Sequence, residues 1–322
     1  MKTLNKVAQP KSSVRAQSSS ESAAKTVEVR TAIECTTLLT EHEHKITFNT
    51  AAIAYRTWRA DKGHACRAVF LFHRGHEYSA RLSELAEAIV LSKPGTIVVA
   101  WDAPSASEVA FAEQPALIDR FVNHVARNYN LQLDEVAVVA HSLGAVSAAA
   151  WIEDFAPPLC ALVLATPAFE INLHVPFAWQ FLSLLHRIRP QSTVRSFVKG
   201  RHLTRDPDQA RAYENDPLID SSIDVTSLLD VRRISRRVVK NAHTIRIPTL
   251  LLTASDDVVV KREPQSAFHQ GMMASQRYYI EYPGARHAVF HEANRNEVFA
   301  DVLHFLDAFS NSAKEPSTHS SS

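Results

Sequence analysis

The sequence predicts an α/β protein with a mostly parallel, twisted sheet, helices on both faces and an inserted helical cap. Short buried strands alternate along the chain with amphipathic helices, which are the crossovers that parallel strands require. A long stretch that is cut by prolines and lacks clear strands interrupts this alternation. The chain has 322 residues, 46% hydrophobic and 21% charged, which fits one large globular unit and excludes a collagen-like, coiled-coil or wholly disordered chain.

Six apolar runs predict strands, because each is bounded by turn residues and is too short for a typical helix. They are residues 68–72, 96–102, 136–140, 161–165, 250–253 and 278–282. Four runs between them space their apolar residues by three and four, as amphipathic helices do. These are residues 80–90, 114–129, 143–155 and 296–309. Ahead of all of them, residues 44–48 and 53–58 predict an antiparallel hairpin.

The folded unit is expected to lie between two polar, Ser-rich tails. Residues 1–25 and 312–322 lack periodicity and cannot bury enough apolar surface to offset the entropy of ordering. The first part of the core is expected at 26–167 and the second at 247–311, with a helical cap at 168–246. Four prolines divide the cap into helical pieces: Pro176, Pro190, Pro207 and Pro217.

The charge balance argues against a nucleic-acid partner. Lys and Arg number 35 and Asp and Glu 34, so the net charge of +1 gives no basic footprint for a phosphate backbone. Cys35, Cys66 and Cys160 are scattered without a Cys-x-x-Cys pair, which argues against a disulfide framework and a zinc site. A reducing compartment fits best, and we expect a cytoplasmic protein.

The first twenty residues are basic but do not resemble a secretory signal. They include four Lys or Arg and no Asp or Glu, and no apolar run of signal-peptide length follows them. We favour a solvated tail, and an organellar transit peptide is the alternative. No run in the chain approaches the about 18–20 apolar residues that span a bilayer.

The most informative motif ends a predicted strand and opens a predicted helix. It runs Val138-Val139-Ala140-His141-Ser142-Leu143-Gly144-Ala145. In a nucleophile elbow the serine hydroxyl is held above the sheet, and the residues two before and two after it must be small. Ala140 and Gly144 meet that need, although alanine stands where G-x-S-x-G has its first glycine. A serine that merely caps a helix is the alternative.

A second motif follows the strand that ends at Phe72. It runs His73-Arg74-Gly75-His76-Glu77-Tyr78-Ser79-Ala80-Arg81. In a serine hydrolase, a backbone N–H in such a loop and the N–H after the nucleophile bind the developing negative oxygen. Gly75 and Leu143 are the candidate donors, and His73 is a candidate substrate-binding residue. A simple His-Gly turn is the alternative.

The remaining motifs supply a carboxylate and a histidine in the chain order that such a site needs. A predicted strand runs into Asp256 and Asp257, and another strand-end loop stops at His287. An imidazole takes the serine proton, and a carboxylate holds the imidazole tautomer and stabilises its charge. Of the 16 histidines, His291 and His269 are the nearest rivals of His287.

These motifs resemble those of α/β-hydrolases of the monoacylglycerol lipase, lysophospholipase and serine aminopeptidase S33 group. The resemblance covers about residues 30–310. His73, Gly75, Glu77, Ser79 and Arg81 fit the group's H-G-x-G-E-H-S-x-R loop, with Gly75 at its first variable position. Arg74 and His76 replace its glycines. After Asp102 the chain has Ala-Pro-Ser-Ala-Ser in place of the group's G-H-G-x-S-type loop, so the resemblance does not predict the shape of the pocket wall.

One branch of the group is more similar still, the hydrolase half of bacterial bifunctional α/β-hydrolase/methyltransferase proteins. That similarity lies in residues 72–77, 166–169, 175–178, 216–219 and 264–265. The resemblance implies Ser142 as nucleophile, His287 as general base, and Gly75 and Leu143 as oxyanion donors. It implies Asp257 as the triad acid, because in the family's P-x-L-L-L pattern the acid lies nine residues after the proline. It implies no cofactor and no metal.

The most apolar helical run of the predicted cap carries four large side chains. They are Phe177, Trp179, Phe181 and Leu184. The run predicts an acyl-binding wall or peripheral contact with a lipid surface, whereas a helix packed on the core is the alternative. Arg187, Arg189 and Arg195 follow it and indicate a solvated basic face rather than a lipid-phosphate site.

Together these features predict a serine hydrolase that cleaves a carboxylic ester, with a monoacyl lipid or lysophospholipid as substrate, through an acyl-enzyme. An acyltransferase with the same triad is one alternative, because the acyl-enzyme does not dictate which nucleophile resolves it. A non-catalytic binding protein of the same fold is the other. The sequence does not predict the oligomeric state.

Overall fold

The computed structural model describes residues 25–30, 36–48, 51–60 and 65–310. The predicted tails lie outside the described residues apart from Lys25, and so does Cys35. Cys66 and Cys160 are free thiols.

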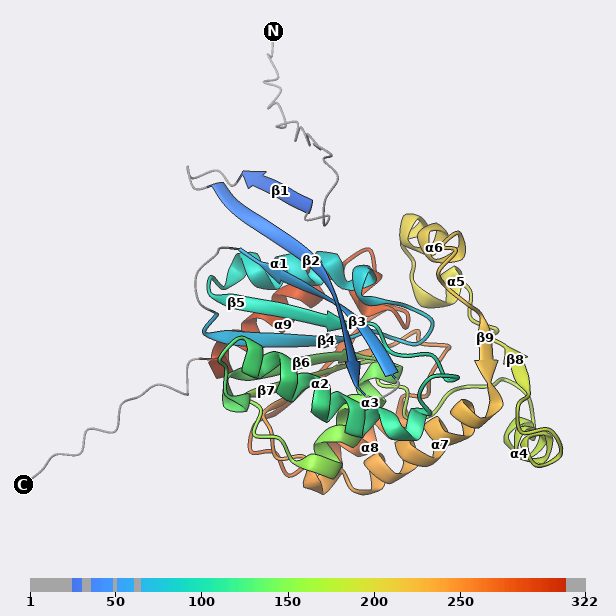
Figure 1. Ribbon diagram of the computed structural model, residues 1–322. Coiled ribbons are helices and arrows are strands. Elements are labelled where there is room, and N and C mark those ends of the chain that lie inside the picture. Colours follow the sequence, from blue (N-terminus) through green and yellow to red (C-terminus); the bar gives the residue numbers. More distant parts are fainter. Residues whose placement is uncertain (1–24, 31–35, 49–50, 61–64, 311–322) are drawn as a thin grey trace, which may run out of the picture.

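A nine-stranded mixed sheet forms the centre of the molecule (Figure 1). Its strands are β1 (Lys25–Arg30), β2 (Thr36–Phe48), β3 (Ala51–Arg59), β4 (Arg67–Phe72), β5 (Thr96–Trp101), β6 (Val136–His141), β7 (Ala161–Ala165), β10 (Thr249–Ala254) and β11 (Arg277–Tyr282). They lie in the order β1-β2-β3-β5-β4-β6-β7-β10-β11. The fold-class prediction is confirmed.

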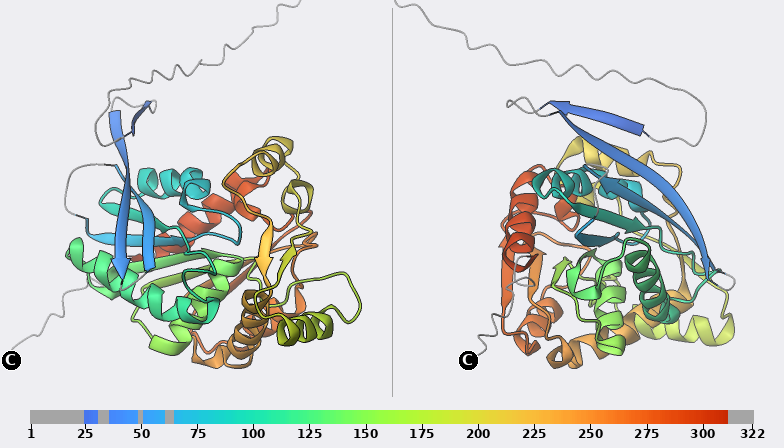
Figure 2. Two further views of the ribbon diagram at one scale, coloured as in Figure 1. Left: turned by 45° about the vertical axis from the view of Figure 1, so that its right-hand side comes forward. Right: turned by 60° about the vertical axis from the view of Figure 1, so that its left-hand side comes forward.

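The six predicted buried strands are β4 to β7, β10 and β11. Every pairing between two of these strands is parallel. The predicted hairpin is also present, since β2 pairs with β3 antiparallel from Thr40–Arg59 to Phe48–Ala51. Figure 2 shows β1 and β2 extending beyond the rest of the sheet. The carboxyl ends of parallel strands meet at one edge, which is where ligands bind in sheets of this kind.

Helices cover both faces of the parallel strands. The helices α1 (Ser83–Ser92) and α9 (Arg295–Ser310) lie on one face, and α2 (Gln114–Asn128), α3 (Leu143–Phe155), α7 (Val225–Lys240) and α8 (Glu263–Gly271) on the other. Short 3-10 turns occupy Ser79–Leu82, Phe111–Glu113, Leu133–Glu135, Ala242–Thr244 and Val289–His291. Neighbouring residues of β4 show the two layers: Leu71 packs with the first set and Phe70 with the second. Strands covered on both faces are apolar throughout, because both sides of each strand are buried.

The inserted segment contains α4 (Ala178–Ile188), β8 (Thr193–Arg195), α5 (Gly200–Leu203), α6 (Pro207–Glu214) and β9 (Ser222–Asp224). Figure 1 shows these elements beside the carboxyl ends of the parallel strands. The expectation that this segment lacks strands is wrong, because β8 and β9 pair antiparallel. Three residues per strand are too few to give a period-two signal. The next helix, α7, packs on α3 and α8 in the core layer.

Two of the cap's dividing prolines bound helices in the expected way. Pro207 opens α6, and the Asp206 side chain accepts hydrogen bonds from the backbone N–H groups of Asp208 and Gln209. Pro190 follows the end of α4. In the described part of the chain, no helix combines the length and the apolar character needed to cross a membrane.

Candidate active site

The turn between β6 and α3 has the backbone of a nucleophile elbow. Ser142 has φ 55° and ψ −112°, a conformation that is costly for a residue with a side chain. Its N–H donates to the Ala165 carbonyl over 2.9 Å, which holds the turn against β7. A Cβ at Gly144 would lie 2.5 Å from the His73 carbonyl oxygen, so only glycine fits there. The predicted spacing of small residues therefore has a direct steric cause.

Two hydrogen bonds join Ser142, His287 and Asp257. The His287 Nε2 and Ser142 Oγ atoms are 2.8 Å apart, and the His287 Nδ1 and Asp257 Oδ2 atoms are 2.8 Å apart. Ser142 and His287 are only 5% and 2% exposed. The structure thus brings together the three side chains that the sequence singled out from three separate strand ends.

Of the two neighbouring carboxylates, Asp257 is the one that contacts His287. Its other oxygen, Oδ1, accepts from the N–H groups of Val259 (2.8 Å) and Val260 (3.0 Å). Asp256 faces away, where it pairs with Arg205 and is about half exposed. The turn therefore holds the Asp257 carboxylate in contact with the imidazole, whereas the Asp256 carboxylate points toward solvent.

The two rival histidines are engaged elsewhere. His291 donates through Nε2 to the Arg81 carbonyl over 2.8 Å, and burial lowers its pKa below the ordinary value. His269 lies in α8, where its ring packs edge-on against Tyr279 with centroids 5.3 Å apart. Neither is hydrogen-bonded to Ser142.

His73 joins two loops rather than facing the substrate. Its Nδ1 donates to the Arg74 carbonyl over 2.7 Å, and its Nε2 accepts from the Ala103 N–H over 3.0 Å. Burial lowers the pKa of the imidazole, which fits the neutral ring that these two bonds require. His73 is not among the residues that line the cavity at Ser142, and its role in binding substrate stays a prediction.

Two residues that sequence reasoning missed hold the backbone of His287. Thr166 Oγ1 donates to the His287 carbonyl over 2.8 Å, and His141 Nε2 donates to the same oxygen over 3.1 Å. Burial lowers the pKa of His141 well below its usual value, so this imidazole is neutral. Both residues lie in motifs noted above, but spacing along the chain does not reveal a contact across more than 100 residues.

The two candidate oxyanion donors lie against one another. A Cβ at Gly75 would come within 2.6 Å of the Leu143 Cδ1 atom, so the loop after β4 approaches α3 closely. Leu143 is the first residue of α3, and its N–H therefore has no partner four residues back in the helix. Both residues line the same cavity as Ser142.

That cavity has a volume of about 180 Å³, far more than the about 10–15 Å³ that one water molecule needs. Apolar side chains form most of its wall. They include Phe111, Ile171, Val194, Phe197, Val198, Leu203, Tyr213, Leu228, Val231 and Val259. They come from the core, from the segment that begins at β8 and from α7, so core and cap enclose the site together. An apolar cavity that ends at a buried serine and histidine fits an acyl group.

The four apolar residues of the predicted cap helix do not line this cavity, which corrects the expectation that they form its wall. Phe177, Phe181 and Leu184 are 77%, 63% and 56% exposed, on the outer side of α4. Trp179 instead packs under the Arg232 guanidinium, whose Cζ lies 4.5 Å from the ring centre. The inner side of α4 is formed by Leu182, which is 5% exposed.

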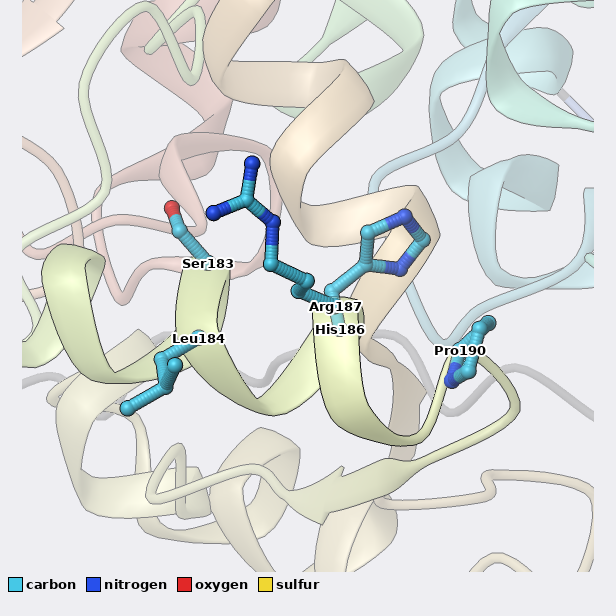
Figure 3. A pocket seen from close by; sticks show the side chains of 5 residues that line it. All are labelled: Ser183, Leu184, His186, Arg187 and Pro190. Atoms are coloured by element: carbon cyan, nitrogen blue, oxygen red, sulfur yellow. The ribbon is translucent and has the colours of Figure 1, made fainter.

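A second hollow of about 710 Å³ lies on this outer surface (Figure 3). Its lining residues are Ser183, Leu184, His186, Arg187 and Pro190. None of them lines the Ser142 cavity, and no serine there is paired with an imidazole. We therefore assign the chemistry to the smaller cavity. Within the described residues, no group of three or more His, Cys, Asp or Glu side chains is placed to hold a metal ion.

The architecture and the elbow define an α/β-hydrolase, and solved structures share the fold. A monoacylglycerol lipase of Paleococcus ferrophilus aligns over 75% of this chain and 94% of its own, with 22% identity and a TM-score of 0.68. A monoglyceride lipase of Saccharomyces cerevisiae aligns over 87% and 98%, with 16% identity and a TM-score of 0.71. Within this class, residues 63–294 match the family model for serine aminopeptidase S33, and the chain belongs to that family.

Curated relatives are found in two bacteria. YnbC of Escherichia coli is 39% identical over 274 residues, which are 83% of this chain but 46% of YnbC. The chain thus spans about half the length of that relative. The phospholipase YtpA of Bacillus subtilis is 25% identical over 264 residues, 79% of this chain and 99% of YtpA. The similarity to bifunctional hydrolase/methyltransferase proteins stays a prediction.

Proposed function

We propose that the protein is a serine ester hydrolase with Ser142 as nucleophile, His287 as general base and Asp257 as the residue that orients His287. The observation that carries this proposal is the pair of 2.8 Å hydrogen bonds that joins the three side chains beside the cavity. A serine alcohol is a weak nucleophile, and an adjacent oriented imidazole is what activates it. The strained elbow aims the hydroxyl at the cavity.

In the first half-reaction, Ser142 Oγ attacks the ester carbonyl carbon while His287 Nε2 takes the hydroxyl proton. The negative oxygen that develops is bound by the N–H groups of Gly75 and Leu143. Asp257 stabilises the charge on the imidazolium through Nδ1. His287 then gives its proton to the departing alcohol oxygen, which leaves an ester between Ser142 and the acyl group.

In the second half-reaction, water attacks this acyl-enzyme. His287 takes a proton from the water, and the same two N–H groups hold the second tetrahedral oxyanion. Collapse releases the carboxylic acid and returns the proton to Ser142. Every bond made or broken involves only the chain, the ester and water.

We assign a monoacyl lipid or lysophospholipid as the substrate class. The mostly apolar wall of the cavity supports this assignment, since an acyl chain gains about 0.8 kcal/mol for each methylene removed from water. The names of similar proteins support it too, because a monoacylglycerol lipase shares the fold and YtpA is called a phospholipase.

The outer face of α4 fits a lipid surface that carries anionic headgroups. Its exposed apolar residues Phe181, Leu184 and Ile188 recur at helical spacing and form one stripe, and the exposed Phe177 directly precedes the helix. Between Glu170 and Asp206 the chain has no acidic residue but six Lys or Arg. An apolar stripe beside basic side chains is the pattern of a helix that lies in the membrane interface. Such a contact would bring the cavity to lipid substrates.

A panel of p-nitrophenyl esters from acetyl to dodecanoyl, assayed beside monoacylglycerol and lysophospholipid, tests the proposal. We expect turnover that rises with acyl length and a burst of p-nitrophenol equal to the enzyme concentration. Acyl products on an added alcohol in preference to water would identify an acyltransferase instead. Binding without turnover of any ester would identify a non-catalytic protein and overturn the proposal.

A further inference from the structure

Arg74 stands where the resembled loop has a glycine, and it is one of the residues that line the Ser142 cavity. The side chain is 4% exposed. Its Nη2 donates to Glu77 Oε1 over 2.7 Å, and its Cζ lies 4.8 Å from the ring centre of Tyr213. Its Nε–H is buried and has no hydrogen-bond partner among the described residues. A residue that lines the cavity therefore carries a buried guanidinium with one unused donor.

The surroundings leave this guanidinium with excess positive charge. Glu77 Oε1 also accepts from Arg81 Nε over 3.0 Å, so two cations share one buried carboxylate. Burying a positive charge without a full counter-charge costs free energy, so binding an anion beside it is favourable. Arg74, Arg81 and Glu77 together carry a net charge of +1 in the loop that contains Gly75.

A second arginine lines the same cavity from the cap. Arg195 lies on β8, is exposed, and has no ion pair or side-chain hydrogen bond among the residues that the structure describes. No Asp or Glu is among the described residues that line the cavity. The described lining therefore combines an apolar wall with two arginines and no acidic residue, and the one carboxylate paired with Arg74, that of Glu77, lies outside the lining.

We propose that this cavity selects esters that carry an anionic group, a phosphate or a carboxylate, which is bound by Arg74 and Arg195. The proposal rests on the proposed esterase function and narrows its substrate class. Arginine suits the role because its planar donors match phosphate and carboxylate oxygens. Neutral esters of the same acyl length contact the apolar wall, but they leave Arg195 without an ion pair and Arg74 with only the carboxylate that it shares with Arg81.

The test compares three esters with one acyl chain, each below its micelle concentration, so that binding to lipid surfaces plays no part. They are octanoylglycerol, octanoyl lysophosphatidic acid and the octanoyl ester of hydroxypropanoic acid. We expect kcat/KM to be at least about tenfold higher for an anionic ester than for octanoylglycerol. The phosphate and carboxylate arms show which anion is preferred, and either preference supports the proposal.

Variants locate the effect. Arg195→Gln is expected to lower the anionic-to-neutral ratio about fivefold and Arg74→Gln about tenfold, while Arg74→Lys retains part of it. The matched control is Arg120→Gln on the exposed side of α2, where the side chain donates to the Ala116 carbonyl of its own helix. A general loss from misfolding cancels in the ratio, because both esters are measured on one preparation. If an Arg74 variant does not fold, Arg195→Gln still tests the proposal through the same ratio.

The failure of this inference is distinct from the failure of the esterase proposal. Efficient hydrolysis of octanoylglycerol with a ratio near one overturns the anion preference and leaves the esterase intact. A ratio above one that neither arginine variant lowers overturns the assignment of the two residues. No hydrolysis of any ester overturns the esterase itself.

Discussion

The carboxyl edge of the sheet and the outer face of α4 both depart from the usual rule that polar side chains are exposed and apolar ones buried. The edge buries polar groups, and α4 exposes apolar ones. At the edge, polar Ser142 and His287 are almost fully buried, whereas on α4 apolar Phe177 and Ile188 are more than 70% exposed. Buried polar groups and exposed apolar patches are both uncommon and informative. The first arrangement fits chemistry in a dry site, and the second fits contact with an apolar partner.

The two regions also differ in how each side chain is fixed. Each polar group at the edge follows a strand end and is held by hydrogen bonds from elsewhere, as Thr166 and His141 hold His287. The exposed residues of α4 have only the helix to position them. Substitutions at the edge should therefore act on catalysis or stability, and substitutions on α4 should act on binding to surfaces.

The largest expected effect is the loss of the nucleophile or the base. Ser142→Ala or His287→Ala should lower kcat for a soluble ester by about 10⁴–10⁶-fold. The fold should survive, because neither substitution adds volume. Steady-state kinetics with circular dichroism as control measures this, and retention of more than a tenth of kcat by Ser142→Ala would contradict the assignment.

The next effect separates the two neighbouring carboxylates. Asp257→Asn should cost on the order of 10⁴ in kcat, as in chymotrypsin-type triads, because the imidazole loses the partner that fixes its tautomer. Asp256→Asn should cost about tenfold or less, since Asp256 pairs with Arg205 instead of His287. Both variants are assayed with one ester. The reverse ranking would show that the turn differs in solution.

A stability effect tests the buried charges behind the edge. Burial alone raises the pKa of Glu77, but the charges of the Arg74 and Arg81 guanidinium groups outweigh it and lower the pKa to about 2. Because the folded pKa lies below the ordinary value of 4.5, the stabilisation is full above that pH and is lost as pH falls toward 2. Glu77→Gln should therefore lower the free energy of unfolding by on the order of 3 kcal/mol near neutral pH and by less in acid.

Urea unfolding of Glu77→Gln and the wild-type chain, each at neutral pH and at a pH between 2 and 4.5, measures this difference. The matched control is Glu214→Gln, a carboxylate on α6 that is exposed and accepts one hydrogen bond from the Gly200 N–H. Equal losses at both pH values would mean that Glu77 acts through shape and not through its charge.

The smallest expected effect lies on α4. Replacing Phe177, Phe181, Leu184 and Ile188 by serine should weaken binding to anionic vesicles by at least about tenfold, because the stripe no longer gains from leaving water. Hydrolysis of a soluble short-chain ester should stay unchanged. Vesicle co-sedimentation measures binding, with Met273→Ser as a control, since Met273 is 62% exposed outside the cap. Unchanged vesicle binding would contradict the proposed contact of α4 with a lipid surface.

The core and the meeting of Ser142, Asp257 and His287 are predictable because their signals are local. The strand β7 and the helix α3 have the predicted bounds, since an apolar run and a three-four spacing each act within one element. Ser142, Asp257 and His287 were found from strand-end motifs together with a family resemblance. Parallel strands bring their carboxyl ends to one edge, so separate motifs in the sequence meet in space.

The cap was predicted less well for a physical reason. Apolar spacing marks α4 as amphipathic, but Phe181 and Leu182 lie on different sides of it, and the sequence does not say which side meets the core. The strands β8 and β9 are too short to leave a periodic pattern. The bonds from His141 and Thr166 to His287 depend on the tertiary fold, which no spacing along the chain encodes.

The most direct test of the central claim is covalent labelling with a fluorophosphonate. Such a probe reacts with a serine that an imidazole activates and an oxyanion site assists. We expect one adduct on the wild-type chain, located by mass spectrometry at Ser142, and no adduct on Ser142→Ala. Labelling that persists in Ser142→Ala, or an adduct on another residue, would contradict the assignment of the nucleophile.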